Sequence, residues 1–207
     1  FDLIDGRGNA IVRGKHLLSL RDLNRSGAIG EMAAAGVSSF KIEGRLKDVA
    51  YVKNTVGAYS RILDRLVSES DGRYVRQSVG AVRLGFNPSL DKSFNRGFTP
   101  YFLTGKAPAK GIASIASPKA TGTKVGVVTD CKPKVITARL DMKLSNGDGL
   151  GYFTPAGIFA GFRLNRVEGN RLFPATPQSI PAGTPLYRNR DKEFDDVISS
   201  AKTTRTI

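Results

Sequence analysis

Two short segments of this 207-residue chain carry charged side chains that could bind one ligand together. In the run Ser39-Phe40-Lys41-Ile42-Glu43-Gly44-Arg45, an acid, a glycine and a base follow alternating apolar residues. The other segment holds Arg21 and Asp22 after an apolar stretch. A planar guanidinium binds a carboxylate or phosphate through two parallel hydrogen bonds. We therefore expect Asp22, Glu43 and Arg45 to bind substrate. The alternative is that these charges only pair with their neighbours.

A second candidate site interleaves basic residues with aromatic rings. It consists of Arg96, Phe98, Tyr101 and Lys106. Cations neutralise phosphates and aromatic rings stack on unpaired bases, so this composition is typical of proteins that bind single-stranded nucleic acid. We predict that the four residues contact RNA. The alternative is that Phe98 is a core anchor in a segment rich in glycine and proline.

The charge of the chain also favours a polyanionic partner. Its formal net charge is +14 and its pI is about 10.2. Between Arg73 and Lys143, thirteen lysines and arginines stand against three acidic residues. Surfaces of this kind attract nucleic acid, although a basic surface can also serve solubility alone. No apolar run approaches the roughly 18–20 residues of a membrane-spanning helix, so we expect no membrane partner.

The residues needed for common hydrolytic and metal chemistry are missing. His16 is the single histidine and Cys131 the single cysteine. Zinc sites and hydrolytic triads need more of these residues, so we predict no metal site and identify no catalytic residue. A lone cysteine also excludes an internal disulfide, which is consistent with a reducing compartment such as the cytoplasm. We expect His16 to be structural and Cys131 to be incidental.

The position of Glu43 depends on a predicted strand that precedes it and a predicted helix that follows it. Residues 39–42 alternate and predict a strand with Phe40 and Ile42 on one face. From the N-cap residue Asp48, apolar residues recur at three- and four-residue steps and predict a helix that reaches Leu66. The helical side chains that we expect to pack on the strand are Val52, Val56, Tyr59 and Leu63. Strand–helix repeats are typical of an α/β barrel, which binds ligands at the carboxyl ends of its strands.

The second half of the chain predicts β structure. From Thr121, short β-forming runs alternate with turn residues, which predicts a small antiparallel barrel. Tight turns are expected at 146–149 and 168–170. The predicted fold class is α+β: the tail of a TIM-like α/β barrel, a connector and a small antiparallel β-barrel. The expected segments are 1–68 for the strand–helix units, 69–118 for the Gly/Pro-rich basic connector, 119–190 for the β-barrel and 191–207 for a tail.

Residues 39–45 resemble a segment of the collagenase-like peptidases, peptidase family U32. Residues 18–24, 51–64 and 94–99 resemble this family too, and the resemblance covers most of residues 1–110 and, more loosely, the rest. The run Leu144–Leu150 is similar to the second-domain barrel of translation factors. The resemblance to the U32 family implies functional roles for Glu43, Gly44 and Arg45 on the barrel rim and for Arg96 and Gly97 in the connector.

Members of this family are commonly described as peptidases, and several bacterial relatives instead act in the hydroxylation of RNA bases or quinone precursors. Those relatives hold an iron–sulfur cluster through cysteines of the barrel, and no such cysteine can be placed in this chain. The resemblance therefore implies that any cluster lies in an N-terminal part outside this sequence, and that this chain alone is inactive.

We interpret the chain as a C-terminal fragment of a U32 protein, because it lacks an initiator Met. It would be the RNA-binding part of a base-hydroxylating enzyme, and its partners would be rRNA or tRNA and the N-terminal barrel of the same protein. One alternative is the substrate-recognition part of a U32 peptidase. Another is a stand-alone binding module.

Overall fold

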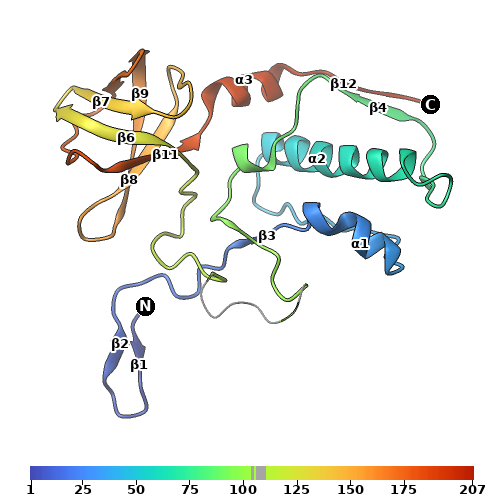
Figure 1. The fold of residues 1–207 in the computed structure, drawn as a ribbon, viewed down its shortest axis with the longest axis horizontal. Coiled ribbons are helices and arrows are strands. Elements are labelled where there is room, and N and C mark those ends of the chain that lie inside the picture. Colours follow the sequence, from blue (N-terminus) through green and yellow to red (C-terminus); the bar gives the residue numbers. More distant parts are fainter. Residues whose placement is uncertain (104, 106–110) are drawn as a thin grey trace. The chain divides into compact units, whose positions relative to one another are not determined.

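The structure is a computed structural model that describes residues 1–103, 105 and 111–207. The chain forms two compact units, and each combines stretches that are far apart in the sequence (Figure 1). The first unit comprises residues 1–23 and 94–193, and the second comprises residues 24–93 and 194–207. The predicted division into four consecutive segments stays a prediction.

The first unit contains a closed barrel of antiparallel strands, most of which are labelled in Figure 1. The barrel strands are β6 (Thr123–Lys132), β7 (Val135–Leu140), β8 (Gly149–Phe153), β9 (Phe159–Glu168), β10 (Arg171–Pro174) and β11 (Pro185–Arg190). Their order is β10-β7-β6-β11-β8-β9, and the barrel closes because β10 pairs with both β7 and β9. The predicted α+β class and the predicted β-barrel are confirmed.

Alternating side chains fill the interior of the barrel. The core residues with no exposed surface are Val125, Ile136, Leu150, Leu164, Leu172 and Leu186. The predicted turns are confirmed as well. Gly147 has a φ of +88° and Gly169 a φ of +58°, in the left-handed region that favours glycine.

The rest of the first unit contains only short strands among its described residues. β1 (Leu3–Ile4) and β2 (Ala10–Val12) form an antiparallel hairpin. β3 (Asp22–Leu23) pairs in parallel with β5 (Phe98–Thr99). The structure does not show the tail of a TIM-like barrel, which therefore stays a prediction.

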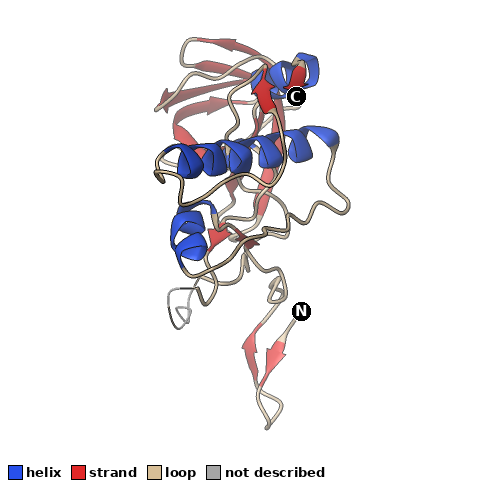
Figure 2. Ribbon diagram, turned by 90° about the vertical axis from the view of Figure 1, so that its right-hand side faces the viewer, coloured by secondary structure: helices blue, strands red, loops and turns tan. Residues whose placement is uncertain are grey.

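The second unit is built on α2 (Val49–Ser68), which is the longest helix in Figure 2. Its other elements are the 3₁₀ helix η1 (Ser26–Ala28), α1 (Ile29–Ala34), β4 (Ala81–Leu84), the 3₁₀ helix η2 (Leu90–Lys92) and β12 (Thr203–Thr206); α3 (Lys192–Ser200) begins in the first unit. The Asp48 carboxylate accepts the Tyr51 N–H at 2.7 Å, which confirms the predicted N-cap. Near the end of the chain, β12 pairs antiparallel with β4.

The predicted strand at residues 39–42 is wrong. Residues 37–48 form neither helix nor strand, and Ile42 is 38% exposed. Alternation of apolar residues predicts a strand only where a neighbouring strand accepts its hydrogen bonds. No strand pairs with this segment among the described residues.

The buried side of α2 differs from the predicted one. Of the four predicted side chains, Val52 and Val56 are 42% and 48% exposed, and Tyr59 and Leu63 are half-buried. The buried residues are instead Asn54, Thr55 and Gly57. A Cβ on Gly57 would lie 3.0 Å from the Leu84 side chain, so this face admits a very close neighbour. Two stripes of α2 could face the rest of the unit, one of valines and one of small and polar residues. Apolar spacing alone predicts that the valine stripe is buried. The small and polar stripe is buried because it allows the 84–89 segment to approach the helix backbone.

Asn54 connects α2 to that segment. Its side-chain amide donates to the carbonyl of Ser89 and to Oγ of Ser93, both at 2.6 Å, and its oxygen accepts the Ser89 N–H at 2.7 Å. We predict that Asn54→Ala lowers the free energy of unfolding by about 2–3 kcal/mol, because the partner groups lose their hydrogen bonds. Val56→Ala, on the exposed stripe, should change it by less than about 0.5 kcal/mol. Urea unfolding measures both, and a larger loss for Val56→Ala would contradict this packing.

Candidate functional site

The structure brings together two predicted site residues that were assigned to different sites. Arg96 donates from Nη2 to Oδ1 of Asp22 at 3.0 Å and from Nε to Oδ2 at 3.3 Å. The backbone N–H of Arg96 donates to the same Oδ2 at 2.8 Å. Hydrogen bonding to Asp22 raises the pKa of Arg96 above its ordinary value. The pair is partly shielded from solvent, with 30% and 24% of the two side chains exposed.

This ion pair holds two distant stretches of the first unit side by side. Asp22 and Phe98 are register partners in the parallel pair β3–β5, and the Asp22 N–H donates to the carbonyl of Gly97 at 2.9 Å. The guanidinium of Arg96 is thus oriented by a carboxylate of the same unit. This geometry favours a positioning role for both side chains. Their roles in substrate and RNA binding stay predictions.

Glu43 and Arg45 lie on the surface of the second unit. Glu43 pairs with Lys41 at 3.0 Å, and both side chains are mostly exposed. Arg45 is exposed and forms no ion pair or hydrogen bond through its side chain with the described residues. Asp22 belongs to the first unit. A common substrate site of these three residues therefore stays a prediction.

The remaining predicted RNA contacts follow β5. Phe98 is half-buried, and Tyr101 is half-buried with its ring edge-on to the exposed Phe102 at a centroid distance of 6.1 Å. Tyr101 has a φ of +51°, which is unusual for a residue with a side chain. Lys106 lies outside the described residues. RNA binding by these side chains also stays a prediction.

The single histidine and the single cysteine lie apart from any polar cluster. His16 is exposed. Cys131 lies in β6, and its Sγ accepts the Ile180 N–H at 3.4 Å and donates to the carbonyl of Gln178 at 3.6 Å. Among the residues that the structure describes, no group of three or more His, Cys, Asp or Glu side chains could hold a metal ion.

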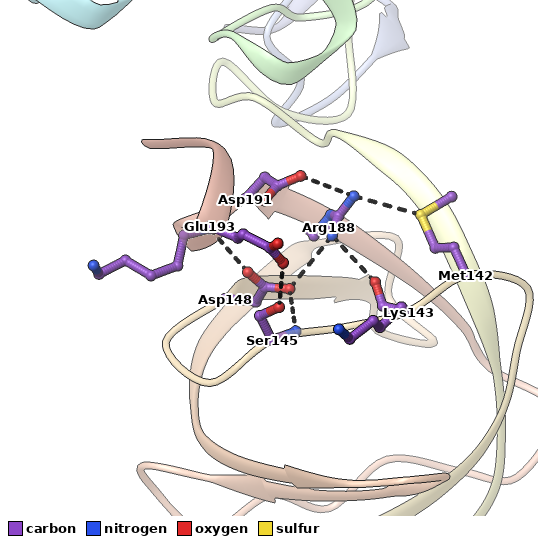
Figure 3. A network of polar contacts seen from close by, with 8 residues as sticks. Met142, Lys143, Ser145, Asp148, Arg188, Asp191 and Glu193 are labelled. Atoms are coloured by element: carbon purple, nitrogen blue, oxygen red, sulfur yellow. Dashed lines mark hydrogen bonds and ion pairs between the residues drawn. The ribbon is translucent and has the colours of Figure 1, made fainter. Parts of the chain in front are cut away.

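Among the described residues, the most buried charged group is the carboxylate of Asp148, which has no exposed surface. Figure 3 shows its polar contacts. Its Oδ2 accepts the Ser145 N–H at 2.9 Å and lies 3.5 Å from Nη1 of Arg188. Its Oδ1 accepts the Lys192 N–H at 2.9 Å. One carboxylate therefore joins the turn before β8, strand β11 and the start of α3.

Arg188 extends this network on its other side. Its Nη2 lies 3.1 Å from Oδ2 of Asp191, and its Nη1 donates to the carbonyl of Lys143 at 3.4 Å. Figure 3 shows that these groups converge on the guanidinium from the loop before β8 and from the end of β11. The sequence pattern predicted the turn at 146–149 but not the buried position of its carboxylate. The Asn-Gly-Asp-Gly run was the available signal, and it does not indicate which partner the acid finds.

We expect Asp148→Ala to lower the free energy of unfolding by about 3–5 kcal/mol, because it leaves Arg188 partly buried beside fewer acceptors. Asp141→Ala is the matched control, since Asp141 is an exposed acid before the same loop, and it should cost less than about 0.5 kcal/mol. Thermal or urea unfolding compares the two variants. Equal losses would show that the network does not stabilise the barrel.

Fold and polar clusters together define an α+β protein built on a small antiparallel barrel, whose buried charges serve its architecture. Peptidase family U32 matches residues 4–113, and the chain belongs to this family. In the part of the chain that the structure describes, no helix is both long and apolar enough to cross a membrane.

Three curated proteins are similar to this chain. It is 35% identical over 217 aligned residues to the 23S rRNA 5-hydroxycytidine C2501 synthase of Escherichia coli (strain K12), a match that covers 100% of this chain and 32% of that protein. It is 26% identical to the tRNA hydroxylation protein P1 of Bacillus subtilis (strain 168), over 67% of this chain and 32% of that protein. It is 30% identical to a collagenase of Porphyromonas gingivalis, over 46% of this chain and 24% of that protein. The chain thus spans about a third or less of their lengths, and no solved structure matches it.

Proposed function

We propose that this chain is the RNA-binding part of a U32 enzyme that hydroxylates bases in RNA. The observation that carries the proposal is the similarity to the rRNA hydroxycytidine synthase, which extends over the whole chain and so includes the β-barrel. The collagenase match covers 46% of the chain, too little to contain both the U32 segment and the barrel. The net charge of +14 supports a polyanionic ligand. An enzyme that modifies cellular RNA would act in the cytoplasm, with rRNA or tRNA as its substrate.

The residues of this chain do not fit an iron–sulfur cluster. Such clusters are held by several cysteine thiolates, and Cys131 is the single cysteine of the chain. Its Sγ lies between the backbone groups of Gln178 and Ile180. We propose that any cluster is held by another part of the protein, and no step of the reaction is assigned to this chain.

An exposed apolar stripe on the second unit supports a partner within the same protein. Val49, Val52 and Val56 follow one side of α2 and are 74%, 42% and 48% exposed, and the preceding Leu46 is fully exposed. Large apolar side chains in a row commonly mark an interface. We propose that an N-terminal TIM-like barrel of the same protein covers this stripe.

The proposal predicts RNA binding with a strong dependence on salt. If about four to six cationic side chains reach phosphates, the affinity should fall roughly 100- to 1,000-fold between 50 and 200 mM salt. Phe98→Ala should weaken binding without altering that slope if its ring stacks on a base. Filter-binding titrations against a control protein of similar size and net charge measure both effects. RNA affinity and salt slope equal to those of the control protein would contradict an RNA-binding function.

A proteolysis assay tests the alternative function, that of a U32 peptidase. We expect no cleavage of gelatin or casein by this chain, because one histidine and one cysteine cannot assemble a common hydrolytic centre. Cleavage that follows the purified protein through gel filtration would favour the peptidase alternative.

A further inference from the structure

We propose that three aromatic rings on the outer face of the β-barrel form a stacking platform for unpaired RNA bases. The rings are those of Phe153 on β8, Phe159 on β9 and Tyr187 on β11. This inference rests on the proposed RNA-binding function and identifies the surface and the form of RNA that the barrel would recognise. It adds base contacts on the barrel to those predicted for the segment around Phe98.

The strand pattern directs the three rings outward. Successive side chains of a strand point to opposite faces. Phe153 follows the buried Tyr152, and Tyr187 follows Leu186, which has no exposed surface. Phe159 precedes Ala160, which packs against the barrel core. The interior is therefore filled without the three rings, and each of them is half-buried at the surface.

The rings meet because their strands are neighbours. β8 lies between β9 and β11, and Phe153 and Phe159 are register partners. The ring centroids of Phe153 lie 5.0 Å from Phe159 and 5.8 Å from Tyr187, and those of Phe159 and Tyr187 lie 6.4 Å apart. Interplanar angles of 58–83° place ring edges against ring faces. The result is a contiguous aromatic surface over three strands.

Two glycines shape the backbone beside the rings: Gly151 is buried under one of them, and Gly161 is exposed. Gly151 is the register partner of both Tyr187 and Gly161. A Cβ on Gly151 would collide with the Phe159 ring, so this glycine lets the ring lie on the strand. A Cβ on Gly161 would meet nothing closer than the Leu150 carbonyl oxygen at 3.6 Å. A planar base can therefore approach the backbone beside the rings.

Cations border the same face. Lys124 is the register partner of Tyr187, and Arg163 is the register partner of Gly149, two residues before Gly151. Both side chains are exposed, and neither forms an ion pair within the part of the chain that the structure describes. Neither β8 nor β11 contains an acidic residue. Proteins bind single-stranded nucleic acid by stacking bases on aromatic rings and by neutralising phosphates with cations. This face offers both, together with exposed backbone at Gly161.

The test measures fluorescence anisotropy of labelled RNA with the full chain. The probes are a single-stranded oligocytidine of about 12 nucleotides, its duplex, and an abasic strand of equal length. We expect the single strand to bind more tightly than either of the others. Phe153→Leu and Tyr187→Leu should each weaken its binding by roughly 10-fold while leaving the salt slope unchanged. Lys124→Ala combined with Arg163→Ala should flatten that slope.

Phe173→Leu is the matched control. Phe173 points outward from β10, and its ring faces the guanidinium groups of Arg166 and Arg171 at 4.2 and 5.4 Å from the centroid. It should leave the affinity for the single strand unchanged. Gly161→Val tests the same surface without removing a ring, because a Cβ has room there. It should weaken binding without lowering the melting temperature, which keeps the test valid if a ring variant fails to fold.

The outcomes separate the two proposals. If the unaltered chain binds no RNA above the basic control protein, the proposed function fails. If it binds RNA but the platform variants retain full affinity, the platform is wrong and RNA binding stands. Equal affinity for the abasic strand, or an equal loss for Phe173→Leu, would also overturn the platform. A dimer that dissociates in Phe153→Leu, with unchanged RNA affinity, would assign the surface to a second copy of the chain.

Discussion

The first unit depends on the charge of Asp148, which is completely removed from water. A buried carboxylate costs several kcal/mol unless hydrogen bonds and an opposite charge compensate it. Asp148 obtains them from Ser145, Arg188 and Lys192, which belong to a loop, a strand and a helix. The carboxylate therefore links these three elements and holds the connection between β7 and β8 against the barrel.

The same contact determines what the outside of the barrel presents. Arg188 points toward the network, so the preceding Tyr187 points to the opposite face of β11. The β8–β11 register places Tyr187 beside Gly151 and Arg188 beside Leu150. Strand β11 therefore carries a buried ion pair on one face and a half-buried aromatic ring on the other. Substitutions in the network should consequently disturb the ring cluster, although no ring touches Asp148 in the described contacts.

Local patterns predicted the barrel well, because alternation and turn residues are properties of neighbouring positions. The predicted turns at 146–149 and 168–170 coincide with the start of β8 and the end of β9. Predictions were less successful where an element pairs or packs with a segment that is distant in the sequence. The strand at 39–42 found no neighbour, and α2 packs through Asn54 and Gly57 instead of its valines. The pairing of Asp22 with Arg96 spans 74 residues and has no local signal. The rings of Phe153, Phe159 and Tyr187 meet only through the register of three strands, which the sequence pattern does not specify.

The proposed contact between the outer face of the barrel and RNA bases can be mapped in solution. Photo-crosslinking of the full chain to a single-stranded RNA that carries 4-thiouridine, followed by mass spectrometry of the peptides, tests it most directly. We expect crosslinks in β8, in the first half of β9 and in β11, with the strongest loss of crosslinking in Phe153→Leu. Crosslinks confined to residues 1–118, with none in these strands, would contradict it.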